Sequence, residues 1–167
     1  MKKKLSLENR EHLAAIIKER IYGSVTVLAV NIGLFLKDDV TVKHAFIAII
    51  STVVGLWLAG LFASVLAYRV VHDANMPRKQ FIEELIIHRG LLLAGTSSVI
   101  MFTLAAVGLI SIHTAIIADI TLAIVAITVT IMRSAKTSSN SVITALISIA
   151  VQAAMAGAII LLKLGTH

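Results

Sequence analysis

The sequence predicts an all-α membrane protein in which five helices cross the bilayer. Three observations predict this class. Of the 167 residues, 58% are hydrophobic and 14% are charged, whereas about a quarter of the residues in a soluble domain are charged. The mean hydropathy is +0.95, and apolar runs of about 18 residues or more, long enough to span a bilayer, recur along the chain. Strands are not expected, because an open sheet leaves backbone groups unpaired in lipid.

The five predicted spans follow the apolar runs in order. The first is short for a hydrocarbon core of about 30 Å, so we expect it to begin within the segment that precedes it. The predicted division is a cytoplasmic amphipathic helix over residues 1–20 and a five-helix transmembrane domain over residues 21–167. Within that domain the spans cover residues 21–36, 44–71, 85–111, 113–132 and 142–164.

The segment before the first span has the pattern of an amphipathic helix. Ser6 can cap its N-terminus, and Leu13, Ile16 and Ile17 share one face. Such a helix lies along a membrane surface. We therefore expect a cytoplasmic anchor that turns into the bilayer at Ile21.

The positions of the basic residues predict the orientation. If the N-terminus is cytoplasmic, every Lys and Arg falls on the cytoplasmic side except Lys37, Lys43 and Lys163. Cytoplasmic loops carry the excess of Lys and Arg in membrane proteins, so the N-terminus is predicted inside and the C-terminus outside. Anionic lipid head groups account for the net charge of +6, and no nucleic-acid partner is predicted. The expected location is a bacterial or archaeal cell membrane, with multiple passes.

One acid interrupts the fourth apolar run. Asp119 lies about six residues below the outer end of that run, or about 9 Å at 1.5 Å per residue. A carboxylate at this depth costs several kcal/mol, so it should face other helices or a wet cavity. Polar side chains of the other spans fall near the same level and are predicted to form a polar centre with it: Asn31, Thr52, Thr103 and Gln152. The alternative is a structural role, with these groups joining helices through hydrogen bonds.

A second group of polar residues surrounds the turn between the second and third spans. Glu84 and His88 are four residues apart on a helix predicted to begin near Pro77, so they share a face. His72 and Asp73 lie nearby in the sequence. We predict no tight metal site there, because the surrounding basic residues would repel a dication: Arg69, Arg78, Lys79 and Arg89.

Catalytic and cofactor motifs are not evident. The chain has no cysteine, which excludes disulfides and thiolate ligands. It has no glycine-rich phosphate loop, no paired carboxylate motif and no nucleophile marked by a neighbouring base. We therefore predict no enzyme activity, no catalytic residue and no cofactor.

Small residues recur every fourth position in two spans, which predicts close helix packing within the chain or between copies. They are Gly55, Ala59, Ala63 and Ala67 in the second span and Ala150, Ala154 and Ala158 in the fifth. The predicted partners are the lipid bilayer and either further copies of the chain or a larger membrane complex.

Two segments, "IYGSVTVLAVNIGL" and "LAGLFASVLAYRVVHD", resemble the first and second spans of the vacuolar iron transporter family. The resemblance implies five spans with the N-terminus cytoplasmic, and it implies dimerisation. The metal-ligand motifs of the family are not matched. Ser24 and Val25 stand where the family carries an Asp, and residues 64–69 read SVLAYR in place of a motif with Met and Glu.

Two functional hypotheses remain at the level of sequence. The first is a proton-coupled transporter or channel for a small cation or solute, with Asp119 as its titratable centre. The second is a non-transporting accessory subunit that packs against larger membrane proteins. The small-residue faces and the short loops favour the second hypothesis, and the intramembrane acid favours the first.

Overall fold

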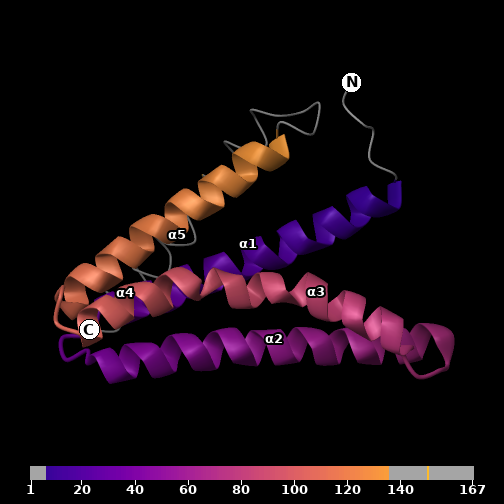
Figure 1. Ribbon diagram of the computed structural model, residues 1–167, viewed down its shortest axis with the longest axis horizontal. Helices are drawn as coiled ribbons and strands as arrows, with labels where there is room; N and C mark the ends of the chain where they lie inside the picture. The colour runs from indigo at the N-terminus through magenta and orange to yellow at the C-terminus, as the bar shows by residue number, and fades with distance from the viewer. Residues whose placement is uncertain (1–6, 136–149, 151–167) are drawn as a thin grey trace.

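The computed structural model describes residues 7–135 and residue 150, and these residues are almost entirely helical (Figure 1). No strand occurs in this part of the chain, so the predicted all-helical class is confirmed there. Apart from residue 150, the predicted fifth span lies outside the described residues, and so does Gln152. The helices are α1 (Leu7–Phe35), α2 (Val42–His72), α3 (Arg78–Ala94), α4 (Thr96–Ala106) and α5 (Ile112–Ala135).

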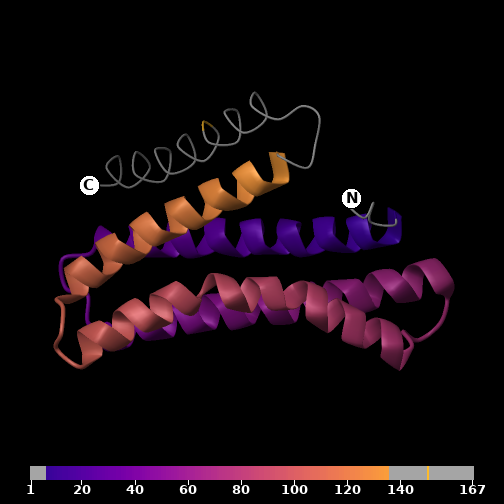
Figure 2. The ribbon, with the colours of Figure 1, turned by 45° about the horizontal axis from the view of Figure 1, so that its top comes forward.

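The helices form an elongated bundle whose turns gather at its two ends (Figures 1 and 2). The turns 36–41 and 107–111 lie at one end, which we call the turn end. Within the described residues, the turn 73–77 lies at the other end, which we call the basic end because Arg69, Arg78 and Lys79 flank that turn. Helices α3 and α4 form two parts of one rod, divided at Gly95.

Within the part of the chain that the structure describes, three helical rods are long and apolar enough to cross a membrane. They are α2, the α3–α4 rod Arg78–Ala106 and the α5 segment Ile112–Thr130. Helix α1 is 29 residues long, but it is not apolar enough to cross a membrane over its whole length, because Lys18, Glu19 and Arg20 lie within it. Its remaining stretch, residues 21–35, is about 22 Å long at 1.5 Å per residue, shorter than a hydrocarbon core of about 30 Å.

Helix α1 continues without a break past the predicted turn at Ile21. The structure therefore shows a single helix from Leu7 to Phe35 in place of an amphipathic helix followed by a separate span. Close contact with α3 supports this continuity. A Cβ atom at Gly23 would lie 2.9 Å from the Ala94 Cβ, and one at Gly90 would lie 3.2 Å from the Arg20 backbone nitrogen. Only glycines allow α1 and α3 to cross this closely.

The apolar core lies toward the turn end, where α1, α2, α4 and α5 meet. Phe102 of α4 is fully buried and packs edge-to-face against Phe46 of α2, with ring centroids 6.0 Å apart and an interplanar angle of 74°. Ile49 of α2 and Ile116 of α5 belong to the same buried cluster as Phe102. A second cluster joins α1 to α5 through Leu28, Ile32, Ala123 and Ile127.

Local signals set the ends of the α3–α4 rod, and they correct the predicted third span, residues 85–111. The helix start predicted near Pro77 is confirmed, because the rod begins at Arg78 with Pro77 as its N-cap residue, ahead of the apolar span. It ends five residues earlier, at Ala106, because the chain turns through Gly108, whose φ is 77°. The second and fourth predicted spans lie within α2 and α5.

Candidate functional site

The Asp119 carboxyl group is fully buried where three helices meet. Its Oδ2 atom accepts a hydrogen bond from Asn31 Nδ2 of α1 at 2.7 Å. The hydroxyl of Ser98 in α4 donates a second hydrogen bond to the same oxygen. Asn31 and Ser98 are also fully buried. We refer to these three residues as the Asp119 cluster, which joins α1, α4 and α5 through one carboxyl oxygen.

The pattern of α5 places the acid on the inward face of the helix. Ile116, Asp119, Ala123 and Ile127 follow each other at intervals of three and four residues, and all four are buried. Asp119 therefore occupies one position of an otherwise apolar stripe. The fold surrounds it with hydrocarbon on its own helix and supplies polar partners from the two facing helices.

The three members of the cluster lie at a similar depth from the turn end. Asn31 is four residues from the end of α1, Asp119 is seven residues from the start of α5, and Ser98 is eight residues from the end of α4. These separations correspond to about 6–12 Å at 1.5 Å per residue. Ser98 and Asp119 thus lie inside two of the segments long enough to cross a membrane, and Asn31 lies on α1 at a similar depth.

Two acceptor atoms of the cluster have no hydrogen-bond partner within the described residues. They are Asp119 Oδ1 and Asn31 Oδ1. Asn31 Nδ2 uses its second hydrogen on the Val27 backbone oxygen at 3.1 Å. A carboxylate can accept about four hydrogen bonds, yet only two donors among the described residues reach this one. The cluster therefore holds more acceptors than donors, an arrangement that a proton or a cation would balance.

The structure brings together two of the five residues predicted for the polar centre, Asp119 and Asn31. The Thr52 hydroxyl instead donates to the Ala48 backbone oxygen of its own helix at 2.7 Å. The Thr103 hydroxyl, on an exposed residue, donates to the Val99 oxygen at 2.6 Å. Neither threonine reaches the Asp119 cluster, and Gln152 lies outside the described residues.

Ser98 is the member that the sequence analysis missed. The predicted third span ended at Ser111, eight residues after Thr103, whereas α4 ends at Ala106, eight residues after Ser98. Because the helix end was predicted five residues too late, Thr103, and not Ser98, was expected at the depth of Asp119. A correct helix end was therefore the signal that would have identified it.

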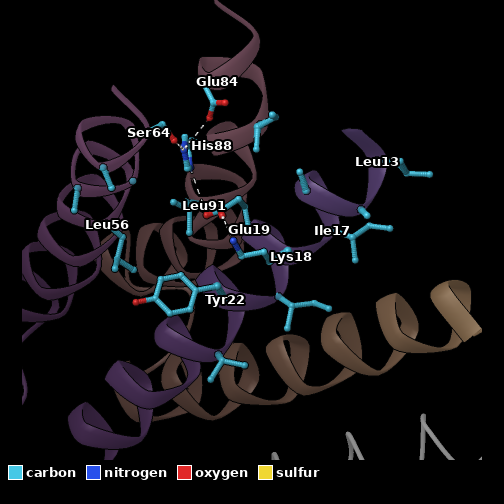
Figure 3. Close-up of a pocket in the computed structure, with 18 residues that line it drawn as sticks. Leu13, Ile17, Lys18, Glu19, Tyr22, Leu56, Ser64, Glu84, His88 and Leu91 are labelled. Atoms are coloured by element: carbon cyan, nitrogen blue, oxygen red, sulfur yellow. Dashed lines mark hydrogen bonds and ion pairs between the residues drawn. The ribbon is translucent and has the colours of Figure 1, made fainter. Parts of the chain in front are cut away.

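A second polar centre surrounds His88 of α3, which is buried. Its Nε2 lies 3.1 Å from the Ser64 hydroxyl of α2 and 3.5 Å from Glu84 Oε2 of its own helix. Its Nδ1 lies 3.4 Å from Glu19 Oε2 of α1 and makes no hydrogen bond within the described part of the chain. Figure 3 shows the carboxyl groups of Glu84 and Glu19 on opposite sides of the imidazole ring.

The predicted pairing of Glu84 with His88 is present, but His72 and Asp73 do not join it. The exposed His72 ring stacks on Tyr68, with ring centroids 4.1 Å apart. Asp73 ends α2 in a left-handed conformation, with a φ of 47°. Among residues 7–135, no group of three or more His, Asp or Glu side chains is placed to hold a metal ion.

The His88 centre opens into a groove of about 1300 Å³ between α1, α2 and α3. Apolar side chains form most of its wall, and His88, Glu19, Glu84 and Ser64 supply polar groups. The Asp119 cluster does not line this groove. The bundle therefore contains two separate polar centres, one enclosed and one open.

Comparisons with protein-family models, with curated proteins and with solved structures find no match to this chain. The resemblance to the vacuolar iron transporter family stays a prediction.

Proposed function

We propose that the protein is a proton-coupled transporter of a small cation or solute, with Asp119 as the group that exchanges the proton. The observation that carries this proposal is the buried Asp119 carboxyl group, whose Oδ1 has no hydrogen-bond partner among the described residues. An acid within a membrane span is costly, and such acids commonly mark ion or proton pathways.

The geometry supports coupling because both donors share one oxygen. Asn31 of α1 and Ser98 of α4 each donate to Asp119 Oδ2 on α5. Hydrogen bonds to an ionised carboxylate are stronger than those to a neutral carboxyl group. Protonation of Asp119 therefore weakens both links at once and loosens α1 and α4 from α5. A change of charge at one atom becomes a change in the packing of three helices.

We propose that the basic end faces the cytoplasm, as the excess of Lys and Arg near membrane helices requires. Arg69, Arg78 and Lys79 lie around the turn 73–77 at this end. The turn 36–41, at the other end, has Lys37 balanced by Asp38 and Asp39. In this orientation the Asp119 cluster lies in the outer half of the bilayer.

Proton movement in liposomes tests the proposal. The purified protein is reconstituted with a pH-sensitive dye inside the vesicles, and gradients of Na⁺, K⁺, Mg²⁺ and Mn²⁺ are imposed in turn. We expect at least one gradient to drive proton movement through the wild-type protein. Asp119→Asn should abolish it, because the amide cannot exchange a proton at that site. Thr103→Val is the matched control, since it removes an exposed hydroxyl of α4 that bonds the Val99 backbone oxygen and no member of the cluster.

Two results would contradict the proposal. The first is proton movement that Asp119→Asn leaves unchanged. The second is a wild-type protein that moves no more protons than protein-free vesicles under all four gradients. Gel filtration in detergent checks that Asp119→Asn still folds, so that a lost signal reports chemistry.

The alternative function, a non-transporting subunit of a larger membrane complex, is favoured by the small-residue face of α2. Gly55, Ala59, Ala63 and Ala67 are all exposed in the described bundle. A small-residue face allows the backbone of a partner helix to approach closely. A pulldown in mild detergent discriminates the two functions. Recovery of a stoichiometric second membrane protein supports the subunit, and recovery of this chain alone counts against it.

A further inference from the structure

The groove beside His88 is wide because its α2 wall is made of small residues. Ala59, Gly60 and Ala63 face the groove from α2, with Leu56 at one end. A Cβ atom at Gly60 would lie 2.8 Å from His88 Nδ1, so the imidazole occupies the space that a larger residue would need. The volume of about 1300 Å³ exceeds that of pockets for drug-sized ligands, about 300–1,000 Å³. The groove has room for an organic molecule with several rings.

The charges that line the groove are unequal in number and in burial. The side chain of Glu19 is 13% exposed and that of Glu84 is 26% exposed, whereas that of Lys18 is 81% exposed. Lys18 Nζ lies 3.7 Å from Glu19 Oε1, and such a solvent-exposed pair compensates little of the carboxylate charge. Two sheltered carboxylates thus face one exposed ammonium group, which leaves a negative charge in the groove while His88 is neutral.

The remaining polar groups agree with a ligand that is positive and mainly apolar. The His88 side chain is 7% exposed, and its Nδ1 has no hydrogen-bond partner within the described residues. The Tyr22 ring lines the α1 side (Figure 3), and an aromatic ring face attracts cations. Arg20 and Arg89 adjoin lining residues in the sequence, but both are exposed and neither lines the groove.

We propose that this groove binds an amphipathic organic cation, a molecule with an apolar body and a single positive charge. The apolar body packs between Ala63 of α2 and Ile17 of α1, and the charge lies in the groove beside Glu19 and Glu84, the two carboxylates that flank the His88 ring. An anionic ligand would place its charge against these two carboxylates. A bare metal ion would leave most of the apolar wall without a contact. The inference goes beyond the proposed function, because binding in the groove requires no transport.

Tetraphenylphosphonium is a suitable probe, because tetraphenylborate has nearly the same shape and the opposite charge. Binding of each ion is measured by equilibrium dialysis with the full chain in lipid nanodiscs, against nanodiscs without protein. We expect saturable binding of tetraphenylphosphonium at one site per chain and none of tetraphenylborate. No saturable binding of the cation would overturn the proposal, and so would equal binding of both ions.

Variants locate the site. Glu19→Gln and Glu84→Gln should each weaken binding of the cation by about tenfold or more, since each removes one of the two sheltered charges. Glu83→Gln is the matched control, because Glu83 is an exposed neighbour on α3 that does not line the groove. If all three variants bound tetraphenylphosphonium with equal affinity, the cation would not bind beside Glu19 and Glu84, and the proposed site would be wrong.

Filling the groove gives a test that does not depend on the charges. Ala63→Leu puts three further carbon atoms into the groove from an exposed position, so the fold should tolerate it and binding should fall by about tenfold or more. Ala67→Leu, one turn away on α2 and outside the groove, is the control. Asp119→Asn should leave binding unchanged. A loss of binding in Asp119→Asn but not in Ala63→Leu would place the cation at the Asp119 cluster and overturn the groove site.

Discussion

The Asp119 cluster and the His88 centre are built from similar groups, yet one is closed and the other open. Each joins three helices through polar side chains around one buried residue. In the Asp119 cluster Asn31 approaches the carboxyl oxygen to 2.7 Å and every member is fully buried. At the His88 centre the two carboxylates stay 3.4 and 3.5 Å from the ring, and a groove of about 1300 Å³ adjoins it.

The difference lies in the volume of the apolar neighbours. Bulky buried side chains lie on the same helices as the Asp119 cluster, Phe102 on α4 and Ile116 and Ile127 on α5. Around His88, α2 presents Ala59 and Ala63, which leave the groove open, and Gly60, beside which the imidazole ring lies. The comparison teaches that apolar packing decides whether a polar group in a helical bundle becomes an enclosed link or a wall of a binding groove.

The largest effect on stability is expected from Asp119→Ala. This change leaves the Asn31 and Ser98 donors without their shared acceptor, and an unsatisfied buried donor costs about 1–3 kcal/mol. The free energy of unfolding in mixed detergent–SDS micelles should fall by about 2–4 kcal/mol. Glu84→Ala at the open centre should cost less than about 1 kcal/mol, because its partner is distant and water can reach it. Equal losses would show that the two centres do not differ in enclosure.

Alanine substitutions at two glycines of α2 test how tightly the His88 ring packs against that helix. Gly60→Ala should lower the free energy of unfolding by about 1–3 kcal/mol, since the new methyl group overlaps the His88 ring. Gly55→Ala has no atom within 4 Å of the new Cβ and should be neutral or stabilise α2 by up to about 1 kcal/mol. The same SDS titration measures both. A harmless Gly60→Ala would mean that the ring has free space on its α2 side.

A smaller effect is expected from Ser98→Ala, which removes one of the two donors to Asp119. The loss should be about 0.5–1.5 kcal/mol, the usual net contribution of a hydrogen bond. Ser97→Ala changes the neighbouring half-buried residue, whose hydroxyl is not part of the cluster, and serves as the control. If both alanines cost the same, the bond from Ser98 to Asp119 contributes nothing specific.

The smallest effect is expected from Thr103→Val. Among the described residues, the Thr103 hydroxyl bonds only the Val99 carbonyl of its own helix, so the substitution should change the free energy of unfolding by less than about 0.5 kcal/mol. Proton movement in liposomes should also stay at the wild-type rate. A larger loss in either measurement would indicate that Thr103 belongs to the polar centre, as the sequence alone predicts.

Hydropathy and helical spacing predicted the elements that depend on local pattern. The all-helical class, the region of α2 and the region of α5 follow from the length of their apolar runs. The pairing of Glu84 with His88 follows from the four-residue spacing on one helix. The meeting of Asn31 and Asp119 follows from their common depth, since an intramembrane acid requires a polar partner at its own level.

Contacts that depend on how two helices cross were not predictable from these patterns. Glu19 reaches His88 because α1 and α3 approach closely at Gly23 and Gly90, and no local pattern specifies that crossing. Ser98 was missed because the end of α4 was placed five residues too late. The continuity of α1 was missed because its charged middle resembles a boundary, whereas packing against α3 keeps the helix intact.

The charged middle of α1 also has a consequence for the order of assembly. With only residues 21–35 free of charge, α1 is a poor candidate for stable insertion on its own, whereas α2 and the α3–α4 rod are long and apolar enough to insert as separate helices. The six-residue turn 36–41 ties α1 to α2, so the ribosome delivers them as a hairpin. Asn31 then meets Asp119 only after α5 has been made, and the polar centre is completed late in biosynthesis.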